Sequence, residues 1–371
     1  MFRTALTSII NKKIKKNYNI TGKIKRSDEN GIFPQEGGNG GTIHAAAFRI
    51  LYCIILSSIR FHFFATIDAH KTENASDAIM SSAAQRISKC LTNYSIEITP
   101  AAARKVGHKL ADLLPQRTAV NVTYLVGANI DDSVAACGLL ADAGMHPVAH
   151  VPARSFASLG NVEDYFSRLC DVGVEEVLVL GGGAPEPAGE LTETMQILES
   201  GLLQAFGFAK VGVAAHPEGH PDIEESQLRE VLVEKAAWAQ RTGVDLYYET
   251  QFCFEANPVI EWEKTTREDL RRALGEAATL PSVRLGVAGP AKMSNLIRFG
   301  IMSGVGNSLQ FLTKHSGNAM KLATTATPDA FIEGIADHRE ADANCLIEGL
   351  HLYPFGGFAK TAKWAEGLVV Q

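Results

Sequence analysis

The sequence lacks any closely spaced pair of cysteines. Its six cysteines are scattered along 371 residues and form no C-x-x-C motif. This spacing argues against a disulfide framework and against a cysteine-based zinc site. It favours buried thiols in a reducing compartment, and we expect the cytoplasm.

A strong net charge and a clean hydrophobic span are also missing. The formal net charge is −6, so no basic field attracts nucleic acid. The longest apolar run, residues 45–66, is interrupted by Arg49, Arg60 and His62 and makes a poor membrane span. We therefore expect neither a nucleic-acid partner nor a membrane partner. A hydrophobic content of 46% with 20% charged residues is typical of a globular protein.

The first 90 residues do not share the pattern of the rest. Residues 1–26 are basic and contain no acid, a Gly/Asn-rich stretch follows, and the apolar run comes last. This order fits neither kind of targeting segment well. We expect residues 1–90 to be an extension that is poorly structured or not native, with the natural start near Met80. We expect residues 91–371 to form one catalytic domain.

From residue 94 onward, short apolar segments alternate with helix-like stretches, a pattern that indicates βα units and a parallel sheet. The eight segments run out near residues 97, 124, 151, 183, 220, 251, 289 and 353. The fold that we predict is α/β, a (β/α)₈ TIM barrel, with a doubly wound sheet as the alternative. Among the helices, we expect 100–114, 194–205, 225–242, 293–304, 307–323 and 328–341.

In such a barrel the chemistry lies where strands run out into the following loops. Glu97 ends the first strand. Burial in the barrel mouth disfavours the charged form of a carboxylate, which raises its pKa and suits it to act as a general acid. The alternative is a solvated loop glutamate.

Several histidines end strands at the same predicted face. His150 and His351 close the third and the eighth strand, and His216 and His220 lie on a Pro/Gly turn after the fifth. That turn lacks the helical spacing of H-E-x-x-H, so we expect ligand hydrogen bonds there and no metal. Several histidines at one end of a barrel favour a site over separate structural roles.

Two further strand ends suit ligand binding. Gly181, Gly182 and Gly183 permit a close approach of the backbone to a ligand, although they do not form G-x-G-x-x-G. Gln251 can both donate and accept hydrogen bonds to a heteroaromatic ring such as a pterin. A hydrogen bond inside the barrel is the alternative role for Gln251.

Six motifs in order along residues 91–371 resemble the methylenetetrahydrofolate reductase family. The most specific is the stretch 212–221, GVAAHPEGHP, which is close to the family's G-V-A-x-x-P-E-G-H-P. The others are SIEITP at 95–100, VTY at 122–124, His150, TQFCF at 250–254 and GLHLY at 349–353.

The resemblance implies a barrel that reduces 5,10-methylenetetrahydrofolate to 5-methyltetrahydrofolate in one-carbon metabolism and methionine biosynthesis. It implies FAD as cofactor and NADH or NADPH as hydride donor, with Glu97 as the general acid. The substrate contacts that it implies are Gln251, Phe254 and His351. The implied cofactor contacts are Thr123, His150, Gly182, Gly183, His216 and His220.

The sequence also departs from the family pattern. The family's L-R-G-D after the fourth strand is Leu180-Gly181-Gly182-Gly183 here, and His216 replaces the usual tyrosine. The family's lysine is displaced, since Lys235 lies one helical turn further back. We therefore expect either direct hydride transfer from the nicotinamide or weak binding of FAD.

Two other functions stay open at this point. One is a folate-binding accessory protein without redox activity, which the glycine replacements favour and Glu97 opposes. The other is an unrelated barrel lyase, which the absence of a Schiff-base lysine at a strand end opposes. Barrels of this kind often self-associate, so a homo-oligomer is compatible with the sequence.

Overall fold

The computed structural model describes residues 84–302 and 324–369. The chain divides into two units, Met1–Ser76 and Asp77–Gln371, and all the described residues belong to the second. The predicted start near Met80 and the predicted helix 307–323 lie outside the described residues.

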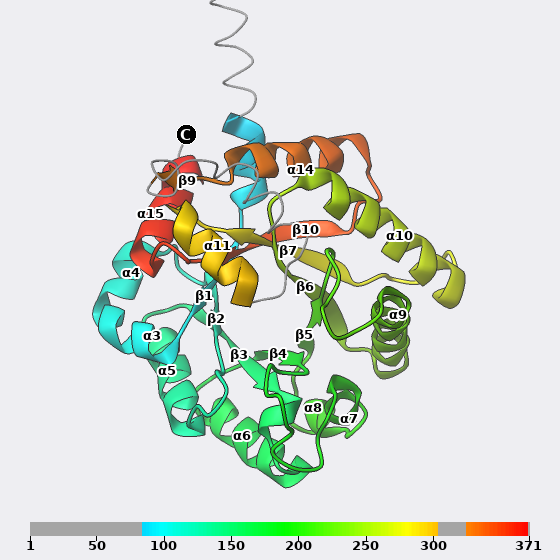
Figure 1. Ribbon diagram of the computed structural model, residues 1–371. Coiled ribbons are helices and arrows are strands. Elements are labelled where there is room, and N and C mark those ends of the chain that lie inside the picture. The colour runs from blue at the N-terminus through cyan, green and yellow to red at the C-terminus, as the bar shows by residue number, and fades with distance from the viewer. Residues whose placement is uncertain (1–83, 303–323, 370–371) are drawn as a thin grey trace, which may run out of the picture. The chain divides into compact units, whose positions relative to one another are not determined.

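Eight parallel strands close into a barrel, and Figure 1 shows them at the centre with helices around them. The predicted TIM barrel is confirmed. The strand order is β1-β10-β7-β6-β5-β4-β3-β2, so each strand neighbours the next barrel strand of the chain. The barrel strands are β1 (Ser95–Ile98), β2 (Ala119–Val122), β3 (His146–Pro152), β4 (Glu176–Leu180), β5 (Lys210–Ala215), β6 (Asp245–Cys253), β7 (Ser282–Ala288) and β10 (Ile347–Tyr353).

Helices connect the strands and cover the outside of the barrel. None of the helices formed by the described residues is long and apolar enough to cross a membrane. The helices are α3 (Pro100–Val106), α4 (Leu110–Leu113), α5 (Ile130–Asp142), α6 (Leu159–Asp171), α7 (Thr194–Leu198), α8 (Leu202–Ala205), α9 (Glu225–Thr242), α10 (Ala256–Leu274), α11 (Met293–Met302), α14 (Asp329–Ala341) and α15 (Phe358–Val369), with 3-10 turns at Gly107–Lys109 and Ala153–Ser155.

The strands alternate between two kinds of side chain. Ile96 and Ile98 of β1 are buried in the hydrophobic core with Val120 and Val122 of β2. Because successive side chains of a strand point to opposite faces, the residues between them face the barrel axis. The register pairs Glu97 with Asn121, so these two inward side chains lie side by side.

Local signals begin the helices that follow β1 and β2. Thr99 caps α3, its hydroxyl oxygen accepting a hydrogen bond from the amide of Ala102, and Pro100 occupies the first helical position. Asn129 caps α5 in the same way through the amide of Asp131. These caps fix the direction in which the chain leaves the barrel mouth.

Two predictions of local structure need correction, and one small sheet was not predicted. The predicted helix 194–205 is two short helices, α7 and α8, because Gly201 takes a left-handed φ of 77° between them. The predicted helix 100–114 is broken at Gly107, which has a φ of 53°. A small antiparallel sheet of β8 (Ala291–Lys292) and β9 (Thr325–Ala326) precedes the last barrel strand.

A helix at residues 84–91 lies upstream of the domain boundary that we expected at residue 91. Ile87, Cys90 and Leu91 of this helix are buried in the core that the barrel shares with its helices. An ion pair of 3.2 Å joins Arg86 to Glu333 of α14. The folded barrel unit therefore includes this segment.

Ion pairs fill the barrel interior near the start of the strands. Arg284 of β7 donates to Glu176 of β4 at 2.6 Å, and His146 of β3 lies 3.0 Å from the other oxygen of that carboxylate. The guanidinium of Arg284 also stacks 3.9 Å from the ring centre of Tyr247. Hydrogen bonds from His146 and Arg284 lower the pKa of Glu176 to about 2, against the effect of burial. The paired side chains of Arg284, Glu176 and His146 therefore occupy the barrel interior near the start of the strands.

Arg284→Leu should lower the free energy of unfolding by about 3–5 kcal/mol, because it leaves the buried carboxylate of Glu176 without its guanidinium. Chemical denaturation monitored by circular dichroism measures the change. The matched control is Arg241→Ala, which removes the exposed ion pair with Glu199 and should change the unfolding free energy by about 1 kcal/mol or less. Equal losses in the two variants would contradict the structural role of Arg284.

Candidate active site at the mouth of the barrel

Glu97 lies near the end of β1 and is half-buried. Burial raises the pKa of its carboxyl group to about 7. A carboxyl group with this pKa is protonated in a large fraction of molecules near neutral pH and still gives up its proton readily. The side chain is therefore suited to general acid chemistry.

Thr123 and His150 follow Glu97 around the barrel, at the ends of β2 and β3. Both side chains are buried, and the Thr123 hydroxyl and the His150 Nε2 have no hydrogen-bond partner among the described residues. Burial lowers the pKa of His150 to about 4, so its ring is neutral near pH 7. Unpartnered buried polar atoms are rare in proteins, and here they supply hydrogen-bonding groups at the ends of the two strands that follow β1.

The loop after β4 carries no ionisable side chain at its first three positions. Gly182 has a φ of 91°, and a Cβ at that position would meet Pro152 of β3 at 2.8 Å. Cβ atoms at Gly181 and Gly183 would meet nothing within 4 Å. Further along, Arg154 donates hydrogen bonds to the carbonyl groups of Ala184 and Pro185 and holds the loop against the end of β3.

His216 and His220 lie together after β5, with their ring centres 5.2 Å apart and the rings edge to face. Burial, with the nearby charges of His220 and Lys235, lowers the pKa of His216 to about 4. The Nδ1 of His220 accepts a hydrogen bond from the amide of Asp222, which fixes the turn. The arrangement offers two ring systems at the strand end.

Gln251 and Phe254 come from the end of β6 and from the residues after it. Gln251 is half-buried. Phe254 packs edge to face on Phe252 at 5.8 Å, beside Phe355 in the same aromatic group. Tyr353 of β10 donates a hydrogen bond of 3.0 Å to the carbonyl group of Thr250 and joins the ends of β10 and β6.

His351 lies deeper in the barrel than the other predicted site residues. Its side chain is fully buried, and its Nδ1 lies 2.8 Å from the Ser95 hydroxyl and 3.4 Å from Glu249 Oε2. Burial lowers the pKa of His351 well below its usual value, so the ring is neutral. It supports the floor under Glu97 and is not exposed at the mouth.

Sequence reasoning missed Glu249 and Asn121, which also face the barrel axis. Asn121 Nδ2 donates a 2.7 Å hydrogen bond to Glu249 Oε1. A period of two counted back from Gln251 contained the signal for Glu249, although the register of β6 against β7 shifts between Glu249 and Phe252. Together with His351 and Ser95, they make a buried polar layer under the mouth.

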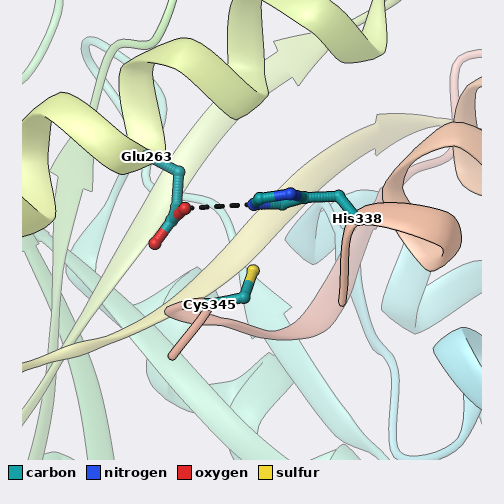
Figure 2. A group of neighbouring side chains, drawn as sticks. All are labelled: Glu263, His338 and Cys345. Carbon is teal, nitrogen blue, oxygen red and sulfur yellow. Dashed lines mark hydrogen bonds and ion pairs between the residues drawn. The ribbon is translucent and has the colours of Figure 1, made fainter. Parts of the chain in front are cut away.

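One group of donors outside the mouth has the composition of a metal site. Glu263 of α10, His338 of α14 and Cys345 lie close together, as Figure 2 shows. Glu263 Oε2 lies 3.2 Å from His338 Nε2, and Oε1 accepts a hydrogen bond from the amide of Leu346. Arg267 lies 3.4 Å from the same carboxylate.

These contacts join α10 to α14, and we call the group of Glu263, His338 and Cys345 the α10–α14 clamp. A cation bound there would displace His338 from Glu263 and would lie close to the charge of Arg267. Burial raises the pKa of Cys345 to about 11, so its sulfur is a neutral thiol near pH 7. The contacts of Glu263 instead hold α10, α14 and the start of β10 together.

Together, the fold and the mouth define a (β/α)₈ barrel with a half-buried carboxyl group and several neutral polar groups where its strands end. The chain belongs to the methylenetetrahydrofolate reductase family, because the model of that family matches residues 82–277, more than half of the sequence. Membership gives the chain a folate-related function in a family of oxidoreductases.

Comparison with solved structures gives barrels of low similarity. An uncharacterized protein from Clostridium thermocellum, described as binding two copies of 5-methyl-5,6,7,8-tetrahydrofolic acid, is 14% identical with a TM-score of 0.49, over 74% of this chain and 92% of that one. Dihydropteroate synthase from Thermus thermophilus is 12% identical with a TM-score of 0.37, over 75% and 91%. A putative deoxyribose-phosphate aldolase from Toxoplasma gondii is 12% identical with a TM-score of 0.40, over 77% and 97%. These values are too low to transfer an activity.

The raised pKa of Glu97 predicts a pH-dependent cost to stability. A carboxyl group with a folded pKa of about 7 and an unfolded pKa near 4.5 binds protons more tightly in the folded state, so stability falls as pH rises through this window. Glu97→Gln removes this loss. Relative to the wild type, the variant should gain about 1–3 kcal/mol of unfolding free energy between pH 5 and pH 8.

Urea denaturation of both proteins across this pH range measures the gain. A difference between the two proteins that does not change with pH would contradict the burial of Glu97.

Proposed function

We propose that this protein reduces 5,10-methylenetetrahydrofolate to 5-methyltetrahydrofolate with NADH or NADPH as the hydride donor. The observation that carries the proposal is Glu97, a carboxyl group with a pKa of about 7 at the end of a barrel strand. Family membership supplies the folate class of substrate. Glu97 itself lies within the residues that the family model matches.

In the proposed reaction, the Glu97 carboxylic acid gives its proton to a nitrogen of the methylene bridge. The carbon–nitrogen bond to that nitrogen breaks, and the bridge carbon becomes part of an iminium cation. Hydride from the nicotinamide adds to this carbon and leaves a methyl group, with oxidised NAD(P)⁺ as the second product. Glu97 is left as a carboxylate and takes up a proton before the next turnover.

The neighbouring side chains are suited to hold the substrate. Gln251 offers both a donor and an acceptor to the edge of the pterin ring. The unpartnered atoms of Thr123, directly after β2, and of His150 on β3 can bind polar atoms of the substrate or the nicotinamide. Because the His150 ring is neutral, it cannot form an ion pair with the negative charges of the folate tail or of the dinucleotide. Other groups must bind these charges.

The residues present fit FAD only in part. Thr123 and His150 offer polar atoms, but Gly181 and Gly183 stand where the family pattern has an arginine and an aspartate, and no side chain there can bind a flavin. Lys235 on α9 is buried, one helical turn from the family position. For this reason the proposed hydride transfer runs directly from the nicotinamide.

Purified protein should therefore show no stoichiometric flavin absorbance, and added FAD should leave its rate of folate reduction unchanged. Absorbance spectra and assays with and without FAD test this expectation. Restoring the family residues in Gly181→Arg/Gly183→Asp is the informative comparison, since flavin retained by that variant alone would support the role of the glycines. Stoichiometric flavin in the wild type would refute direct transfer.

Glu97→Gln should lower the turnover of methylenetetrahydrofolate reduction by roughly 10²–10⁴-fold, because it removes the proton donor and keeps the shape of the side chain. Oxidation of NADH or NADPH, measured together with the formation of 5-methyltetrahydrofolate, gives the size of the loss. Substrate binding by calorimetry is the control and should change little. Folate binding without turnover in the wild type would instead support an accessory protein that has no redox activity.

A further inference from the structure

A second glutamate lies on the barrel axis under Glu97. Glu249 belongs to β6, and the strand order places β6 four strands away from β2 in either direction around the barrel. Its Oε1 nevertheless accepts a 2.7 Å hydrogen bond from Asn121 on β2. The carboxyl group therefore reaches across the interior. Asn121 is the register partner of Glu97, so Glu249 is held by the neighbour of the proton donor.

The other oxygen of Glu249 faces neutral groups. Oε2 has no hydrogen-bond partner among the described residues and lies 3.4 Å from the Nδ1 of His351. That ring is uncharged, and its Nδ1 contacts the Ser95 hydroxyl at 2.8 Å. The cation whose charge acts on Glu249 is Arg284, which is already bound to Glu176 at 2.6 Å. Within the described part of the chain, Glu249 therefore has no counter-ion of its own.

The charges around Glu249 come from several strands. Arg284 favours its ionised form, whereas the negative charges of Glu97 and Glu176 oppose it. Burial is the largest effect, and together these effects raise the pKa of Glu249 to about 8. The inward residues of the barrel around it are Glu97 of β1, Asn121 of β2, His150 of β3, Glu176 of β4, Gly212 of β5, Tyr247 of β6, Arg284 of β7, and His351 and Tyr353 of β10.

We propose that Glu249 is a positioning residue of the active site, an uncharged carboxylic acid that holds Asn121 under Glu97, lies against His351 and lets the two glutamates carry at most one negative charge between them near neutral pH. When Glu97 gives up its proton, the new negative charge then lies near a neutral acid. Ionisation of Glu249 as well would bring two anions together in a buried space and would leave the site inactive. The effect on catalysis rests on the proposed function, whereas the shared charge does not.

The shared charge is tested by an infrared titration of carboxylic acid groups in the whole protein, without substrate. The wild type should show two steps, at apparent pKa values of about 7 and about 8. Glu249→Gln should remove the upper step and leave the lower one in place. Glu97→Gln should leave one step, at a pKa below that of Glu249 in the wild type, because the opposing charge has gone.

The matched control is Glu263→Gln, which changes another fully buried glutamate that lies in the α10–α14 clamp. Both steps should persist in this variant. A Glu249→Gln protein that retains both steps, or a Glu97→Gln protein whose remaining step does not move, would overturn the proposal.

The role in catalysis is tested by the pH profile of kcat/KM. In the wild type, the slope of log(kcat/KM) against pH should steepen on the alkaline limb from about −1 to about −2, because both acids must hold their protons. In Glu249→Gln it should stay at about −1. Glu249→Leu cannot bind Asn121 and should lower kcat by about 10²-fold, whereas Glu249→Gln should lose less than about tenfold.

A wild-type limb that stays at a slope of about −1, or a Leu variant as active as the Gln variant, would refute this role. Thermal melting of each variant separates loss of fold from loss of activity. If no variant and no wild-type sample reduces folate, the proposed function fails, while the infrared steps still decide the shared charge.

Discussion

Closure of the barrel is the constraint on which the rest of the structure depends. Eight strands direct alternate side chains toward one axis, and polar groups on that axis must find their partners within the protein. Near the start of the strands this requirement is met by ion pairs of Arg284, Glu176 and His146. Near the end of the strands it is met only in part, and the unpaired groups there are the ones suited to chemistry.

Three glutamates inside this barrel have three different pKa values. Glu176 is held by a guanidinium and an imidazole, and its pKa falls to about 2. Glu97 has burial without a partner charge, and its pKa rises to about 7. Glu249 has burial and a like charge nearby, and its pKa rises to about 8. Since all three residues are glutamates, burial and the charge of the neighbours decide which carboxyl group can donate a proton.

Much of this arrangement was predictable from the sequence because it depends on local patterns. The alternation of apolar strands and helices indicated the barrel, and Gly243 ends α9 where the sequence predicted a helix end. The break at Gly201 was not predictable, because a glycine inside a helical pattern marks either a stop or a tolerated position. The role of Asn121 depends on Glu249, which lies 128 residues away, so only the closed barrel brings the two together.

Glu97 could be singled out because it follows an apolar strand directly and matches a family motif. Glu249 could be placed on the inward face by the period of the strand, but the absence of a counter-ion depends on distances between strands. The clamp of Glu263 with His338 gives no pattern in sequence, since its members come from two helices and the start of a strand. Groups assembled across elements are therefore the part that needs a structure.

Gly212 shows how closely the lower barrel is fitted. A Cβ atom there would lie 2.4 Å from the ring of Tyr247 and 2.7 Å from Leu178. The same tyrosine ring covers Arg284 at 3.9 Å. A larger residue at 212 therefore requires that both Tyr247 and Leu178 change or move first. Substitutions at these contacting positions can therefore accumulate only in certain orders during evolution.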